Sequence, residues 1–283
     1  MNTDQIKRMS SQDLTNEVVS RLEATPDDRM REIMKSLVRH LHDFIIEVQL
    51  TDKEWMEGIT FLTQTGHMTD SVRQEFILLS DTLGVSSLVD LINHSDVESL
   101  ATEPTILGPF YVPESPLREF GESMVEYEDG GEPAILRGRV LTETGEAIPN
   151  AELDVWQNAA TGFYAVQQPD VQTLNNLRGR YTTNADGEFS IRTVRPVPYP
   201  IPADGPVGKL LRDTGRHEWR AAHVHLKISA PGFIDVATHI FDSSSDYLDS
   251  DTVFGVKESL IEDFVPDESG TLVCERNFVL SST

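Results

Sequence analysis

The N-terminal third of the chain carries the hydrophobic spacing of amphipathic helices. Between residues 28 and 48, apolar residues recur at steps of three and four, which places them on one helical face. They are Met30, Ile33, Met34, Leu37, Val38, Leu41, Phe44, Ile45 and Val48. We therefore predict that residues 1–103 form a helical N-terminal domain.

Local signals predict where these helices begin. Thr25 followed by Pro26 is typical of an N-cap and a first helical residue. Thr51 and Glu54 have the spacing of a capping box, in which each side chain accepts a hydrogen bond from the other residue's backbone N–H. Thr69, which precedes "DSVRQEFILLSDTLG", indicates a third start.

Past Pro104 the pattern changes to short alternating runs such as "AILRGRVL", "TNADGEFSIRTV" and "HVHLKISAPG", interrupted by Gly, Pro, Asn and Asp. This pattern favours a β-sandwich or barrel. The expected class is mainly β with α, in which residues 104–283 form the second domain. One late helix is expected over residues 251–264. Residues 112–133, rich in Pro, Gly and acidic residues, are expected to form an exposed connection.

Composition argues against several classes of function. The 283-residue chain has a formal net charge of -24, which would repel a nucleic-acid backbone. No apolar run is long enough to span a bilayer, and the N-terminus lacks the apolar core of a signal peptide, so we expect a cytoplasmic protein. Cys274 is the single cysteine, which leaves His, Tyr, Asp and Glu as ligands for any metal.

His223 and His225 stand two residues apart in a stretch that alternates like a strand. Side chains at i and i+2 of a strand lie on one face about 7 Å apart, so both imidazoles can reach one ion. The alternative is a pair of histidines whose hydrogen bonds are satisfied within the protein or by water. The motif alone does not decide between the two.

Two tyrosines, Tyr164 and Tyr199, stand beside Gly or Pro in loops. A loop tyrosine is ordinarily a packed ring with its hydroxyl in water. Two tyrosines together with two histidines suggest a metal site, because phenolate is a hard oxygen donor that favours a highly charged ion. Ferric iron is the natural candidate.

Five segments then carry a family pattern: "ILGPFYVPESP", "WQNAATGFYAVQQPD", "GRYTTNADGEFSIRTVRPVPYPIPADGPVG", "WRAAHVHLKISAPGF" and "THIFDSSSDYLDSDTVFGVKESL". Together they resemble the intradiol ring-cleavage dioxygenases, most closely the hydroxyquinol 1,2-dioxygenases. The resemblance implies a β-sandwich catalytic domain with one Fe(III) per subunit, held by Tyr164, Tyr199, His223 and His225. It also implies that benzene-1,2,4-triol and O2 react to 3-hydroxy-cis,cis-muconate, the enol form of maleylacetate, in aromatic-compound catabolism.

The same resemblance implies roles for residues around the metal. Tyr199 is the ligand that substrate displaces, whereas Tyr164 stays bound. Arg220 lies beside the substrate ring, where a fixed cation stabilises negative charge that develops on carbon. Its alternative is a surface salt bridge. His239 stands where many catechol-cleaving relatives have glutamine, and it could donate a hydrogen bond to substrate or contact Arg220.

The resemblance to the hydroxyquinol branch also implies a substrate pocket, formed by the end of an N-terminal helix and the segment that enters the sandwich. Its residues here are Leu78, Asp81, Ile106, Leu107, Gly108, Pro109, Phe110 and Val253. Asp81 could accept a hydrogen bond from the additional ring hydroxyl. Alternatively, it is a solvated helix residue.

Alternatives remain for the metal and for the activity. A three-histidine site, or two histidines with a carboxylate from Asp242 or Asp246, would be a different metal site, and the latter binds Fe(II). Catechol or chlorocatechol could be the substrate. A non-catalytic β-sandwich binding protein is the alternative of another class. The other histidines are expected to be solvated: His40, His42, His67, His94 and His217.

The apolar face of the N-terminal helices is wider than one contact with a sandwich requires. Related enzymes dimerise through these helices and hold a lipid between the subunits. The resemblance therefore implies a homodimer through Arg29 to Leu50, with a phospholipid at the interface.

Overall fold

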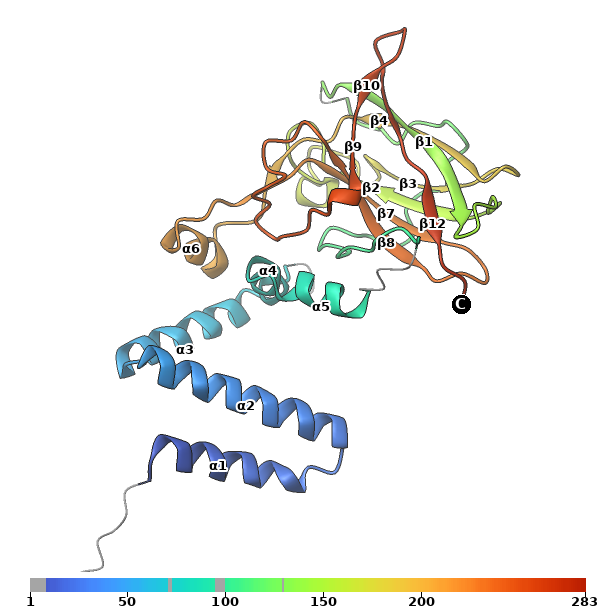
Figure 1. Cartoon of the computed structure of the whole chain (residues 1–283). Coiled ribbons are helices and arrows are strands. Elements are labelled where there is room, and N and C mark those ends of the chain that lie inside the picture. The colour runs from blue at the N-terminus through green and yellow to red at the C-terminus, as the bar shows by residue number, and fades with distance from the viewer. Residues whose placement is uncertain (1–8, 71–72, 95–99, 129) are drawn as a thin grey trace, which may run out of the picture. The chain divides into compact units, whose positions relative to one another are not determined.

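The computed structural model describes residues 9–70, 73–94, 100–128 and 130–283. The chain forms two compact units, residues 1–63 (unit 1) and residues 64–283 (unit 2). Helices precede a mainly β region, which confirms the predicted class (Figure 1). The domain boundary expected between residues 103 and 104 stays a prediction.

Unit 1 holds α1 (Ser11–Arg21), α2 (Asp28–Val48) and most of α3 (Asp52–His67). A short 3-10 turn connects α1 to α2. The two helices are joined by a hydrogen bond between the Thr15 hydroxyl and Nδ1 of His42, which are 2.9 Å apart. No helix among the described residues has the length and hydropathy that a membrane span requires.

The predicted start of α2 was wrong, and that of α3 is confirmed. Asp27, not Thr25, is the N-cap, because its carboxylate accepts a hydrogen bond from the Met30 N–H at 2.6 Å. At α3 the capping box is present. Thr51 donates its N–H to the Glu54 carboxylate at 2.9 Å, and the Thr51 hydroxyl accepts the Glu54 N–H at 3.3 Å.

The apolar face of α2 is exposed in the single chain. The exposed apolar side chains of this helix are Met30, Ile33, Leu37, Leu41, Phe44, Ile45, Ile46 and Val48. Soluble proteins rarely leave so large a contiguous apolar stripe in water, so the face is suited to an interface.

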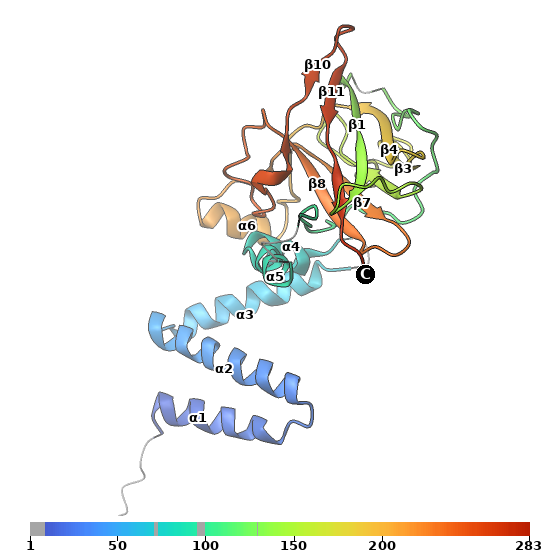
Figure 2. The same cartoon turned by 45° about the vertical axis from the view of Figure 1, so that its right-hand side comes forward.

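Unit 2 contains α4 (Glu75–Thr82), α5 (Val85–Asn93) and α6 (Pro206–Asp213), and both views place the three helices together at one end of the unit (Figures 1 and 2). Gly84 lies between α4 and α5 with φ +72, a left-handed conformation that glycine adopts without strain.

A buried carboxylate connects α4 to α6. Glu75, which is fully buried, accepts the Val207 N–H in the first turn of α6 at 3.2 Å and forms an ion pair with Arg73 at 2.9 Å. The predicted start at Thr69 was wrong, because the helix begins at Glu75. The Thr69 hydroxyl instead accepts the N–H of Phe76 at 3.3 Å.

Two five-stranded sheets form the body of unit 2 (Figures 1 and 2). One has the order β10-β11-β1-β12, with β4 paired to β1, and the other has the order β3-β2-β7-β8-β9. The strands of the first are β1 (Pro133–Thr142), β4 (Glu188–Val194), β10 (Val265–Pro266), β11 (Leu272–Glu275) and β12 (Phe278–Leu280). Those of the second are β2 (Glu152–Trp156), β3 (Arg178–Thr182), β7 (His223–Ser229), β8 (Val236–Asp242) and β9 (Ile261–Glu262). A separate pair consists of β5 (Tyr199–Pro200) and β6 (Trp219–Arg220).

The hydrophobic core of unit 2 draws on both large sheets. Leu136 on β1 and Val155 on β2 are fully buried in it. On β7, the apolar residues Val224 and Leu226 belong to the same core, as the alternation predicts. The residues between them therefore point to the opposite face of the sheet.

The predicted late helix was wrong. Residues 251–264 form turns, a 3-10 turn (Glu258–Leu260) and β9, which pairs with the end of β8. Phe254 has φ +57, which a helix does not accommodate. Lys257 bonds outside the segment, since its ammonium group donates to the Asp90 carboxylate at 2.7 Å.

The expected exposed connection, residues 112–133, is only partly exposed. In its described residues, Met124 is fully buried and Ser115 nearly so. The backbone of Arg118 donates to the carbonyl of Arg180 on β3 at 2.9 Å, so the segment is fixed along the sheet edge.

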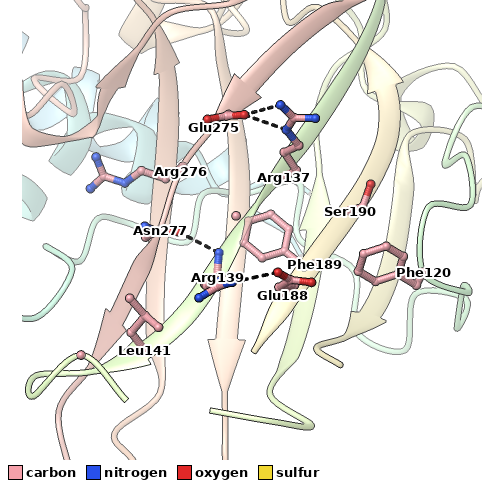
Figure 3. A pocket seen from close by; sticks show the side chains of 12 residues that line it. Phe120, Arg137, Arg139, Leu141, Glu188, Phe189, Ser190, Glu275, Arg276 and Asn277 are labelled. Carbon is pink, nitrogen blue, oxygen red and sulfur yellow. Dashed lines mark hydrogen bonds and ion pairs between the residues drawn. The ribbon is translucent and has the colours of Figure 1, made fainter. Parts of the chain in front are cut away.

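An open groove of about 810 Å³ crosses the outer surface of β1 (Figure 3). Four of its charged side chains form two pairs. Arg137 donates to Glu275 at 2.8 Å, and Arg139 lies 3.0 Å from Glu188. Gly138 lies between them, and a Cβ there would lie 1.8 Å from the carbonyl oxygen of Arg276. The groove contains none of the residues predicted for the metal or the substrate.

Candidate metal centre

The two histidines of the H-x-H motif lie on the face of β7 that points away from the core. His223 and His225 are almost fully buried, and their Nε2 atoms are 3.1 Å apart. His225 is paired across the sheet with Trp156 on β2 and with His239 on β8. The indole of Trp156 stacks on the His225 ring with 4.8 Å between centroids and an interplanar angle of 9°.

Both predicted tyrosines join the histidines. Tyr164, which precedes a 3-10 turn, places its hydroxyl 3.1 Å from Nε2 of His225. Its hydroxyl is also hydrogen-bonded to that of Tyr199. The Tyr199 ring lies 5.5 Å from the His223 ring. The four side chains therefore bring two imidazole nitrogens and two phenol oxygens to one place.

Burial controls the protonation of this cluster. Loss of water raises the pKa of Tyr164 well above its usual value, and Tyr199 raises it further. Burial likewise lowers the pKa of His223 to about 3, and the neighbouring Arg220 adds to this effect. Neutral imidazoles are the form that binds metals, and a multiply charged cation would lower the pKa of the phenols that bind it.

His239 is a third imidazole at the same place. Ligand nitrogens of His223, His225 and His239 all lie within 4.8 Å of one another. Nδ1 of His239 hydrogen-bonds the Thr105 hydroxyl, whereas its buried Nε2 has no protein partner among the described residues. The three-histidine alternative is therefore geometrically available beside the tyrosine-histidine set.

The carboxylate alternative lacks such geometry. Asp242 forms an ion pair with Arg195, with 2.6 Å between Nε and Oδ2, and Asp246 is exposed. In the described part of the chain, neither belongs to a group of His, Cys, Asp and Glu that could hold a metal.

Arg220 is buried beside the cluster, not exposed in a surface salt bridge. Its Nε lies 3.0 Å from Oδ1 of Asp251, and its Nη1 lies 3.5 Å from Nε2 of His223. Burial alone would lower the pKa of Arg220, but Asp251 together with Tyr199 and Tyr164 outweighs that effect, and the pKa is raised. The arginine is therefore a permanent cation next to the two tyrosines and the histidines.

Two residues of the predicted substrate pocket contact the cluster directly. Phe110 stacks on Tyr164, with 4.5 Å between ring centroids. Gly108 has φ +77, and a Cβ there would lie 3.1 Å from Cε1 of His225. Arg178, a buried residue of β3, donates to the Phe110 carbonyl at 2.7 Å and so fixes this segment.

The other predicted pocket residues lie farther out. Asp81 on α4 is buried, which excludes a solvated residue; burial raises its pKa, while a hydrogen bond from Ser86 and the charge of Arg220 oppose the rise. Leu78 and Val253 are also buried, and Ile106 lines a cavity of about 90 Å³ next to Gly255. Leu107 and Pro109 are exposed.

Trp156, Thr105, Arg178 and Asp251 were not identified from the sequence as site residues. Trp156 and Asp251 lie within the quoted family segments, and Thr105 and Arg178 directly precede two of them. Nothing local marks their roles, because their contacts arise from strand register and long-range folding. Of the histidines expected to be solvated, His40, His67 and His94 are exposed, whereas His42 and His217 are half-buried and hydrogen-bonded.

The family model described as "Dioxygenase" matches residues 106–281, and that described as "Catechol dioxygenase N terminus" matches residues 27–100. A 6-chlorohydroxyquinol 1,2-dioxygenase of Cupriavidus pinatubonensis is 47% identical over 95% of this chain and 97% of its own length. A hydroxyquinol 1,2-dioxygenase of Rhizobium sp. is 46% identical over 92% of this chain and 88% of its own.

A solved structure agrees with these matches. The crystal structure of hydroxyquinol 1,2-dioxygenase from Pseudomonas putida DLL-E4 superimposes with a TM-score of 0.92 at 48% identity. The superposition covers 96% of this chain and 99% of the Pseudomonas putida chain. The likeness therefore extends over nearly the whole chain, the helices and the β-sheets alike.

We predict that Gly108→Ala lowers metal binding while Gly121→Ala does not. Both glycines have nearly the same φ, +77 and +76, so each substitution adds backbone strain of about 1 kcal/mol. Only the Cβ at position 108 would press on His225, since nothing lies within 4 Å of a Cβ at position 121. Metal content per folded chain measures the difference. Equal metal content in the two variants would contradict this role of Gly108.

Proposed function

The chain belongs to the intradiol dioxygenase family, and from that membership we propose that it cleaves the ring of benzene-1,2,4-triol with O2. The proposed product is 3-hydroxy-cis,cis-muconate, the enol form of maleylacetate, within aromatic-compound catabolism. The observation that carries the proposal is the convergence of Tyr164, Tyr199, His223 and His225 at one buried place in a chain whose relatives include hydroxyquinol 1,2-dioxygenases.

We propose that these four residues hold one Fe(III) per subunit. Two hard phenolate oxygens and two neutral imidazoles suit an oxidised iron better than Zn²⁺ or Cu⁺. The raised pKa of Tyr164 supports this, because a buried phenol becomes a phenolate only beside a strong positive charge. A site of three histidines would leave both buried tyrosines without a function.

When bound, ferric iron would draw electron density from the two adjacent oxygens of the substrate and make its ring reactive toward O2. The protein's part is to bind the substrate as a dianion and to receive its protons. The Tyr199 phenolate oxygen would accept one of them when substrate takes its place, and a displaced hydroxide would take the other and leave as water, so no uncompensated charge is buried. Tyr164 would keep its position, because its ring stacks on Phe110 and its hydroxyl is hydrogen-bonded to His225.

Arg220 and His239 act on the substrate side of the cluster in this proposal. The guanidinium stabilises negative charge as it develops on the ring carbon. His239 has a buried Nε2 without a partner in the described residues, which is available for a hydrogen bond to the bound substrate or oxygen.

Asp81 is the proposed determinant for the third hydroxyl. In this proposal it forms the pocket wall together with Leu78, Val253 and the segment from Ile106 to Phe110. Asp81 is near enough to Arg220 for that charge to affect its pKa. A substrate that lacks the third hydroxyl would leave this buried carboxylate without its hydrogen bond, which lowers kcat/KM for that substrate. The chlorinated triol named for one relative is a second candidate substrate.

We further propose a cytoplasmic homodimer formed through Arg29 to Leu50, with a phospholipid at the interface. The exposed apolar stripe of α2 supports the dimer, because pairing would remove it from water. Acyl chains would fill apolar space that two helical faces leave between them.

We expect the iron-loaded protein to show a broad visible band that shifts when benzene-1,2,4-triol is added without oxygen. The band arises from phenolate-to-iron charge transfer, so Tyr164→Phe and Tyr199→Phe should each weaken or displace it. Tyr181→Phe is the matched control, since Tyr181 is equally buried but donates to the Glu122 carbonyl at 3.1 Å. A protein that stays colourless after iron loading would refute the proposed ligands.

Oxygen uptake with benzene-1,2,4-triol, catechol and chlorocatechol should rank the triol first. Asp81→Asn should reduce the ratio of kcat/KM for triol over catechol by about 10- to 100-fold, the range expected for a lost hydrogen bond to a charged group. Catechol turnover by the same variant is the internal control. A wild-type preference for catechol would overturn the substrate assignment.

Leu41→Glu should convert the dimer into a monomer, because a charge would be buried at the centre of the α2 stripe. Ser36→Glu adds the same charge at an exposed position about a quarter turn from Leu37 on that helix and should leave the dimer intact. Light scattering after size exclusion measures both masses, and circular dichroism checks folding. A monomeric wild type at micromolar concentration would exclude the proposed dimer.

A further inference from the structure

We propose that Asp251 is the positioning residue for Arg220, and this inference rests on the proposed function. Asp251 precedes the segment 252–256 and is nearly fully buried. Its part in the reaction is indirect, since it holds the guanidinium in the one orientation that directs a free N–H edge toward the cluster.

The contacts of Asp251 define that orientation. Oδ1 lies 3.0 Å from Nε of Arg220, and Oδ2 lies 3.3 Å from Nη2, so the carboxylate binds one edge of the guanidinium in a two-point contact. The backbone N–H groups of Gly255 and Ala221 also donate to Asp251, at 2.8 and 3.4 Å. The carboxylate is thus itself fixed from both neighbouring segments.

Once this edge is occupied, Nη1 is the guanidinium nitrogen that remains for the site. It lies 3.5 Å from Nε2 of His223. Asp251 and the two tyrosines are the side chains that raise the pKa of Arg220. The charge of Arg220 in turn acts to lower the pKa of Asp81 and of His223. A rotation about the last side-chain bonds of Arg220 would move its charge away from the reacting carbon.

Gly255 completes the clamp. A Cβ at this position would lie 2.8 Å from Nη2 of Arg220 and 3.2 Å from Oδ2 of Asp251, so a side chain there would separate the pair. The backbone of Gly255 has to approach the ion pair closely in order to donate its N–H. Arg220, Asp251 and Gly255 therefore form one unit in which each member limits the position of the next.

The competing explanation is that Asp251 only stabilises the fold by neutralising a buried arginine. The chain offers a matched pair to test this. Asp242, equally buried, binds Arg195 in the same two-point manner, with distances of 2.6 and 3.2 Å. The side chains of that pair form no hydrogen bond with any of the four proposed ligands, so its loss should affect stability alone.

The experiment compares Asp251→Asn, Asp242→Asn and wild type after iron loading. We expect Asp251→Asn to lose about 10²-fold in kcat, the cost typical of a catalytic group displaced by about 1 Å. Both kcat and kcat/KM should fall together, because the lost interaction belongs to the transition state. Asp242→Asn should keep its kcat even where its melting temperature falls. The visible band of substrate-free Asp251→Asn should match wild type, since all four ligands are intact.

A double-mutant cycle with Arg220→Gln decides how Asp251 acts. If it works through Arg220, then Arg220→Gln and the double variant will have the same kcat, and the two losses will not add. Additive losses, or an unchanged kcat in Asp251→Asn, would overturn the inference. An inactive wild type would instead contradict the proposed function, so the two failures are distinguishable.

Discussion

The register of β7 between β2 and β8 is the constraint on which the site depends. It sets His225 between Trp156 and His239, with His223 on the same face. Because side chains alternate along a strand, a slip of one residue would turn both imidazoles into the hydrophobic core and bring Val224 and Leu226 out. The apolar face of β7 is therefore what holds the proposed metal ligands in place, since moving it would remove Val224 and Leu226 from the core.

The second requirement is electrostatic. Phenols, imidazoles and an arginine are buried together in a chain with a large negative charge, and each needs a partner in place of water. The structure supplies short-range partners: Asp251 for Arg220, Thr105 for His239, and the backbone carbonyl of Ala221 for His223 at 2.6 Å. Burial raises the pKa of Tyr164 and lowers the pKa of His223 and His225, so it favours the uncharged form of each of these groups.

Much of this could be predicted from sequence because the signals are local. The alternation in β7 predicted which residues face the core, and the capping box at Thr51 predicted the start of α3. The family segments predicted that two tyrosines and two histidines would meet. The failures involve long-range contacts. Residues 251–264 have helical spacing, but Lys257 binds Asp90 and the segment ends as a strand beside β8. Likewise, no local pattern marks Asp251 as the partner of an arginine thirty-one positions earlier.

The buried Glu75 has a consequence for how such an enzyme can diversify. It stands at the start of α4, whose later residues form the proposed pocket wall, and its carboxylate anchors the first turn of α6, which the chain reaches a few residues after Tyr199. The Glu75 side chain thus connects α4, which contributes to the proposed substrate pocket, with α6, which follows the proposed ligand Tyr199 in the chain. Changes in α4 that alter substrate specificity and replace Glu75 are therefore expected to shift the position of Tyr199 as well. Substitutions in α4 that keep Glu75 can alter the pocket with less effect on Tyr199.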